Sequence, residues 1–167
     1  MKTLLLGDLS PTKTTVSSFQ SKDMETLFTD TVQLFENNDI NFINLECAIT
    51  DCDADIPKIG PALKAPVETA DVLKKLGVNC VGVSNNHFFD FGIKGANDSI
   101  KALNVAGIPF TGFGENYEDS RKNFVIEKNK AKRHKCTQHH RNCKVAARYG
   151  IKTSYKIIIH IGSRATI

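Results

Sequence analysis

The first 127 residues alternate short apolar runs with segments of helical period, and this alternation limits the possible folds more than any other feature. The apolar runs, each expected to be a strand, are KTLLLGD, INFINLE, VNCVGVS, IPFTGFG and NFVIEK. Hydrophobic spacing predicts helices over 21–38, 67–76 and 95–107. Gly77 and Gly107 end the last two, and Asn97 or Asp98 caps the third. The pattern predicts an α/β fold with a largely parallel sheet.

Polar side chains stand where three of the expected strands end. Asp8 ends the first strand, Glu46 ends the second, and the sequence Asn85-Asn86-His87 follows the third. In open parallel sheets, ligands bind at the carboxyl ends of the strands, so these residues are expected to converge on one edge. Carboxylates, amides and imidazoles bind divalent metals, and paired metals in such a site activate water and neutralise a transferring phosphoryl group.

Each of these residues also has an ordinary structural explanation. An Asp at a strand end often caps a turn, and Asn-Asn is a common loop dipeptide. A lone His beside two Phe residues, as in His87-Phe88-Phe89, is often a packed core residue. The coincidence at three strand ends favours a functional site, but the structural alternative stays open on these grounds alone.

Five motifs occur in order along this part of the chain: GDLSP, NLECAITD, ALKAP, SNNHFFDFGIKG and GIPFTGFGEN. Together they resemble the successive motifs of the CapA family, the capsule and poly-γ-glutamate synthesis proteins that are similar to calcineurin-like metallophosphoesterases. The resemblance covers about residues 3–127. It implies a metallophosphatase-like α/β sandwich with a dinuclear metal site.

The resemblance also implies roles for individual residues. Asp8 and Glu46 would be metal ligands from the first two strands, and Asn86 would be the ligating amide. His87 would polarise the substrate or donate a proton to the leaving group. Asp90, three residues further on, would orient His87 or the loop.

The resemblance further implies a substrate, cofactors and partners. Asn85 and Lys64 are assigned to substrate binding, since Lys64 could meet an anionic group. The expected cofactors are two divalent metal ions of the Mn, Fe or Zn type. The expected partners are an anionic polymer or phosphoester substrate and membrane proteins of capsule synthesis. Nucleic acid is not expected.

The charge of the chain is split unevenly. Residues 1–127 carry eleven Lys and Arg against eighteen Asp and Glu, whereas residues 128–167 carry eleven Lys and Arg and no acidic residue. We therefore predict two regions, the N-terminal part of a CapA-like domain over 1–127 and a basic tail of irregular composition over 128–167. Within the tail, YKIIIHIG predicts a strand over 155–162, which carries His160 as a further candidate metal ligand.

Three interpretations of the tail remain open. A local shift of reading frame would explain both the change of composition after residue 130 and the strand-like run that follows it. A zinc-binding insert would use Cys136, His139, His140 and Cys143, although their spacing matches no usual zinc motif. A basic arm would attract phosphates or an anionic surface, although few aromatic residues accompany its charges.

The sequence thus predicts a CapA-like protein of capsule or poly-γ-glutamate synthesis, truncated and weakly active or inactive, since the family's later strands are missing. The alternative is a non-catalytic module that binds an anionic polymer and uses the basic tail. A nucleotide-binding domain lacks support, because GDLSPTKTT has no glycine-rich loop. The absence of a signal peptide or membrane-length apolar run predicts a cytoplasmic chain, and five irregularly spaced cysteines predict reduced thiols.

Overall fold

The computed structural model describes residues 2–122, 124–129 and 154–159. They fall into two compact units, the first containing residues 2–122 and the second containing strands β7 and β8. Strand β7 (Phe124–Asn129) pairs antiparallel with β8 (Ser154–Ile159). NFVIEK is therefore a strand, as predicted, but it belongs to a separate two-stranded sheet. Most of the basic tail, including the candidate zinc ligands and His160, lies outside the described residues.

A four-stranded parallel sheet forms the centre of the first unit, in the spatial order β1-β2-β5-β6. Its strands are β1 (Thr3–Leu9), β2 (Ile40–Leu45), β5 (Cys80–Gly82) and β6 (Phe110–Thr111). Each lies within an apolar run of the sequence, and the predicted α/β fold with a parallel sheet is confirmed. The architecture is consistent with a metallophosphatase-like fold.

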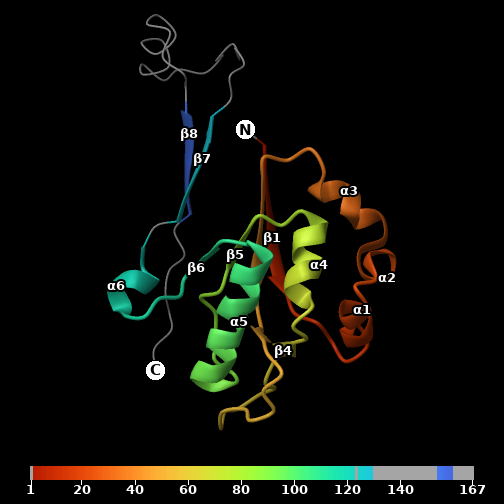
Figure 1. Cartoon of the computed structure of the whole chain (residues 1–167), viewed down its shortest axis with the longest axis vertical. Coiled ribbons are helices and arrows are strands. Elements are labelled where there is room, and N and C mark those ends of the chain that lie inside the picture. The colour runs from red at the N-terminus through yellow and green to blue at the C-terminus, as the bar shows by residue number, and fades with distance from the viewer. Residues whose placement is uncertain (1, 123, 130–153, 160–167) are drawn as a thin grey trace, which may run out of the picture. The chain divides into compact units, whose positions relative to one another are not determined.

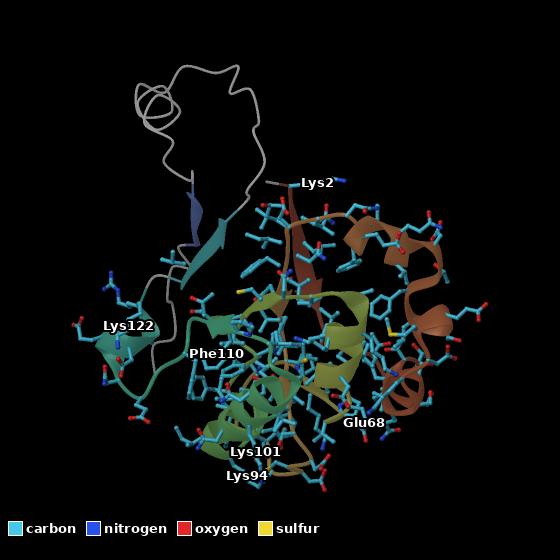
Figure 2. The ribbon with its side chains drawn as sticks, turned by 45° about the horizontal axis from the view of Figure 1, so that its top comes forward. Lys2, Glu68, Lys94, Lys101, Phe110 and Lys122 are labelled. Atoms are coloured by element: carbon cyan, nitrogen blue, oxygen red, sulfur yellow. The ribbon has the colours of Figure 1, made fainter. Side chains whose placement is uncertain are left out.

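Two helices form the core against this sheet. Helix α4 (Thr69–Leu76) and helix α5 (Gly92–Ala106) lie side by side in front of the strands in Figure 1. In Figure 2, side chains fill the space between these helices and the strands. The largest fully buried ones include Leu45, Leu73, Val81, Phe88 and Leu103.

The ends of these two helices are set largely by glycine. Gly77 and Gly107 cap α4 and α5 in the left-handed conformation, as predicted. Helix α5 begins earlier than predicted, at Gly92, and neither Asn97 nor Asp98 caps it. Asp98 lies inside the helix, where its carboxylate accepts hydrogen bonds from Lys94 and from the hydroxyl of Thr50.

The single helix predicted over 21–38 is wrong. The chain forms α1 (Val16–Ser21), α2 (Met24–Phe28), a 3-10 turn η1 (Thr29–Thr31) and α3 (Val32–Phe35), and the three helices follow one another upward on the right of Figure 1. Lys22 has a left-handed φ of 56° and ends α1, and Asp23 starts α2 by accepting from the Thr26 amide. The apolar residues keep a helical spacing across these breaks because the short helices direct apolar side chains toward the core.

Three short elements complete the first unit. Strands β3 (Ala48–Ile49) and β4 (Lys64–Ala65) pair in parallel and hold the segment between them against the body. The Ser99 hydroxyl of α5 joins this region to the helix, since it accepts from the Ile49 amide at 2.8 Å and donates to the Gly95 carbonyl at 2.7 Å. Helix α6 (Tyr117–Ser120) follows β6. The cysteines of the described part, Cys47, Cys52 and Cys80, are free thiols.

Candidate functional site

The carboxyl ends of β1, β2 and β5 lie next to one another because the three strands are parallel and adjacent. Asp8 lies near the end of β1, Glu46 follows β2, and the segment Ser84–Asp90 follows β5. The edge where the sequence predicted a convergence of polar side chains is thus one continuous edge of the sheet.

A bulge in β1 decides which way Asp8 faces. Leu5 pairs with Phe42 and Asp8 pairs with Asn44, so two residues of β1 stand opposite one residue of β2. Strict alternation would have turned Asp8 to the side opposite Leu5, toward the buried face. The extra residue instead puts Asp8 on the same face as Asn44, whose amide donates to the Asp8 carboxylate at 2.7 Å.

Asp8 and Glu46 form a carboxyl pair. Their side chains are hydrogen-bonded, and this contact raises the pKa of Glu46, with burial and the charge of Asp8 acting in the same direction. The same bond with Glu46, followed by the bond from Asn44, lowers the pKa of Asp8. Two carboxyl groups this close together are two oxygen ligands side by side, and divalent cations bind to oxygen ligands of this kind.

The two side chains of the Asn85-Asn86 dipeptide differ, because that of Asn85 is hydrogen-bonded to described residues and that of Asn86 is not. The Asn85 amide donates to the Asn44 side chain at 3.2 Å and to the Leu45 carbonyl at 2.9 Å, and its oxygen accepts from the His87 amide. Asn85 therefore fixes the loop after β5 to the end of β2. Asn86 is exposed, and its side chain makes no hydrogen bond within the described part of the chain.

His87 is held by Asp90. The Nδ1 atom of His87 lies 2.7 Å from Oδ2 of Asp90, whose side chain is completely buried. Burial alone would raise the pKa of Asp90, but hydrogen bonds from Lys58, His87 and the Leu63 amide outweigh it and lower that pKa. The ionised carboxylate can only accept, so Nδ1 carries the hydrogen of this bond. Nε2 makes no hydrogen bond to any described residue and is left for another partner.

Lys58 completes the surroundings of Asp90. Its ammonium lies 2.5 Å from Oδ1 of Asp90 and 3.3 Å from Nδ1 of His87. The sequence analysis missed this residue. Lys58 is separated from the histidine motif by about 30 residues and sits in a segment of Asp, Pro and Gly without periodicity, so no pattern marked it.

Lys64 lies in a different environment. Its ammonium donates to Asp53 at 2.7 Å and to the Cys52 carbonyl at 2.9 Å, and it stands 5.3 Å from the centre of the Phe91 ring. None of these contacts involves Asp8, Glu46 or His87. A cavity of about 260 Å³ adjoins it, lined by residues of α1 and of the β3 and β4 region: Val16, Gln20, Thr50, Asp51, Asp53, Lys64, Ala65 and Pro66.

The described residues alone give a limited set of metal ligands. Asp8 and Glu46 are joined, but the described residues contain no group of three or more His, Cys, Asp or Glu side chains arranged around a metal position. The Asp8–Glu46 pair offers two carboxyl groups to one cation, while the Asn44 amide faces Asp8 with its nitrogen. A second ion needs ligands from elsewhere, and the candidate His160 lies outside the described residues.

The fold and this edge define an α/β protein with an acidic and histidine-containing site at the carboxyl ends of its parallel strands. A family model, that of the bacterial capsule synthesis protein PGA_cap, matches residues 2–150. The chain belongs to this family, and the resemblance to CapA proteins is confirmed.

Similar proteins come from two bacteria. The capsule biosynthesis protein CapA of Bacillus anthracis is 40% identical over 65 residues, which are 39% of this chain and 16% of that protein. Two proteins of Sinorhizobium fredii (strain NBRC 101917 / NGR234), the uncharacterized proteins y4sH and y4uA, are each 30% identical over 103 residues, 53% of this chain and 20% of theirs. The chain thus spans about a fifth or less of the length of these relatives. Among the described helices, none has the length and hydrophobicity to cross a membrane.

Proposed function

We propose that this capsule-synthesis family chain carries a cation-dependent phosphoesterase-like site at the carboxyl edge of its sheet. The observation that carries the proposal is the Asp8–Glu46 carboxyl pair, which lies at the strand ends beside the His87 loop. The natural substrate would be a phosphoester or an anionic polymer of capsule synthesis, and membrane proteins of that process would be its partners.

Asp8 and Glu46 would hold a divalent ion of the Mn, Fe or Zn type, with Asn86 as the exposed amide that is free to join them. Such an ion supplies Lewis acidity and a more acidic bound water when it is present. A dinuclear site would draw its further ligands from outside the described residues, with His160 as the first candidate.

The other roles, which are proton donation, orientation and substrate binding, are assigned to side chains of the protein. His87 directs Nδ1 toward Asp90 and so leaves Nε2 for the substrate, where it would donate a proton to the leaving oxygen. Asp90 holds the ring in that orientation. Asn85 secures the loop and would contact the substrate, and Lys64 would bind a more distant anionic group of a long substrate.

The test is metal binding and phosphodiesterase activity of the purified chain, with Mn²⁺ and bis(p-nitrophenyl) phosphate. Asp8→Asn is expected to lose both Mn²⁺ and activity. His87→Gln is expected to keep Mn²⁺ and to lose roughly 100-fold in turnover, the usual contribution of a general acid. Asp53→Asn, an exposed carboxylate that pairs only with Lys64, is the matched control and should keep Mn²⁺. Mn²⁺ binding that survives Asp8→Asn would refute the proposal.

A second candidate function is binding of an anionic polymer without catalysis. The observation that favours it is the charge of residues 128–167, which carry eleven Lys and Arg and no acidic residue. Binding of this kind depends on salt and is indifferent to Asp8. The two functions can therefore be separated in the same preparation.

A further inference from the structure

We propose that Lys58 is a positioning residue that fixes the imidazole of His87 through the buried carboxylate of Asp90. The role deepens the proposed function, because it concerns the histidine assigned to the substrate. The contacts that support it are nevertheless properties of the folded chain and can be tested without any activity.

Both oxygens of the Asp90 carboxylate accept hydrogen bonds. Oδ1 accepts from Lys58 at 2.5 Å, and Oδ2 accepts from the Leu63 amide at 2.8 Å and from His87 Nδ1 at 2.7 Å. Lys58 holds the carboxylate by Oδ1, which leaves Oδ2 turned toward the Leu63 amide and the imidazole. Lys58 thereby fixes the orientation of the carboxylate, and the carboxylate fixes the ring position of His87. The side chains of Asp90 and Lys58 are 0% and 19% exposed, so solvent contributes little to this arrangement.

Lys58 also keeps the imidazole from turning away. Its ammonium lies 3.3 Å from Nδ1, and because both atoms bear hydrogens they cannot bond one another. Both are instead directed at the carboxylate between them. The positive charge of Lys58 balances the negative charge of the buried Asp90 carboxylate. Without Lys58, the main partner of that carboxylate would be a neutral imidazole ring.

The segment that carries Lys58 is fastened to Asp90 on both sides. The Ile56 amide donates to the Asp90 carbonyl at 2.9 Å, and the Leu63 amide donates to its carboxylate. Apolar packing holds this segment only at its end, where Leu63 packs against the core, since Ile56 is 39% exposed and Ile59 is fully exposed. The polar contacts with Asp90 are therefore what positions Lys58, and they join residues 56–63 to the histidine loop as one unit.

The first measurement is on the full wild-type chain labelled with ¹⁵N. The His87 Nδ1–H proton is expected as a slowly exchanging imidazole signal, assigned by its loss in His87→Gln. It should show a nuclear Overhauser effect to the ammonium protons of Lys58. A ring signal without this effect would overturn the proposal whatever the variants do.

The second measurement compares variants. Lys58→Met is expected to shift the His87 Nδ1–H signal or broaden it beyond detection, and Lys58→Arg to restore it. Lys94→Met is the matched control, because Lys94 of α5, which Figure 2 labels, also pairs with an aspartate, Asp98, at 2.7 Å, and no hydrogen bond among the described residues joins it to His87. An unchanged His87 signal in folded Lys58→Met would refute the proposal.

Turnover gives a separate readout. If the phosphoesterase function holds, Lys58→Met should lower kcat roughly 10–100-fold with little change in KM, the range seen when a residue that orients a site group is removed. If the wild-type chain has no activity but the His87 signals respond as expected, the positioning role stands and the proposed function fails.

Discussion

Asp90 is the residue on which the histidine site depends most. Its carboxylate and backbone carbonyl together bond Ile56, Lys58, Leu63 and His87, so one residue joins the loop before β4 to the loop after β5. A buried carboxylate is tolerated when every oxygen is paired, and costly when a partner is lost.

We predict that Asp90→Asn lowers the free energy of unfolding by about 3 kcal/mol, because the ammonium of Lys58 would then be buried without a counter-charge. Urea denaturation measures the change. Asp53→Asn is the control, since its ion pair with Lys64 is exposed to solvent and should make no measurable difference. Equal midpoints for wild type and Asp90→Asn would contradict the prediction.

The pH dependence of that loss follows from the lowered pKa of Asp90. An acid whose pKa is lower in the folded state stabilises the fold above its unfolded value, here near 3.8, and this contribution disappears as the pH falls through the folded value. The difference in stability between wild type and Asp90→Asn should therefore be full at pH 6 and shrink below about pH 3.8. Urea titrations over that range measure it, and a difference that grows on acidification would refute the assignment.

The pKa of Glu46 is shifted in the opposite direction to that of Asp90. Its raised pKa means that the folded chain favours the protonated form, so stability is lost as the pH rises through the folded value. We expect Glu46→Gln to raise the melting temperature at pH 7 in the presence of a chelator, and to gain nothing below about pH 4.5, near the unfolded value. Added Mn²⁺ should stabilise the wild type and not the variant. A lower melting temperature for metal-free Glu46→Gln would contradict this.

At the scale of elements, the sequence identified the strands because parallel sheets bury continuous apolar runs, and it identified the ends of α4 and α5 because Gly77 and Gly107 adopt conformations that favour glycine. The prediction of a single helix over 21–38 failed because the spacing of apolar residues stays helical across Lys22 and Asp23, although the chain turns at these two residues. The two-residue strands β3 and β4 are too short for any pattern to mark them.

The cap of α4 gives a prediction at this scale. Gly77 has φ of 88°, and a Cβ there would meet the Asn41 side chain at an ordinary 3.6 Å, so strain rather than crowding is the cost of substitution. Gly77→Ala should lower the free energy of unfolding by about 1 kcal/mol, and Gly77→Asn by less, since Asn tolerates the left-handed region better. Urea denaturation of both variants checks the order, and equal losses would point to a different cause.

The site was only partly predictable for a related reason. Residues at strand ends could be listed because the topology of parallel sheets brings such ends together. Asn44 had a weak signal, as a polar residue in an apolar strand. Lys58 had no signal in the sequence. Its contact with Asp90 depends on the path of an irregular segment, and that segment has no hydrophobic periodicity.

At the scale of the whole molecule, charge separates two regions of the chain. Residues 1–127 are acidic in balance and residues 128–167 are basic throughout. We predict that the chain binds a poly-glutamate surface at low salt and that binding falls steeply between about 50 and 200 mM NaCl, as screening shortens the reach of the charges. Asp8→Asn should leave this binding unchanged, whereas replacing lysines of the 128–152 segment by glutamine should abolish it. Salt-independent retention would contradict an electrostatic origin.

The extra residue in β1 has a consequence for how related chains of different length are compared. Removal of Gly7 would leave Asp8 opposite Asn44 and Leu9 opposite Leu45 in a regular strand, because the bulge accommodates one residue more than the pairing requires. A relative with a one-residue gap at this point would therefore keep its carboxylate at the same sheet edge. A deletion at Gly7 therefore indicates a strand without the bulge, and the candidate site stays in place.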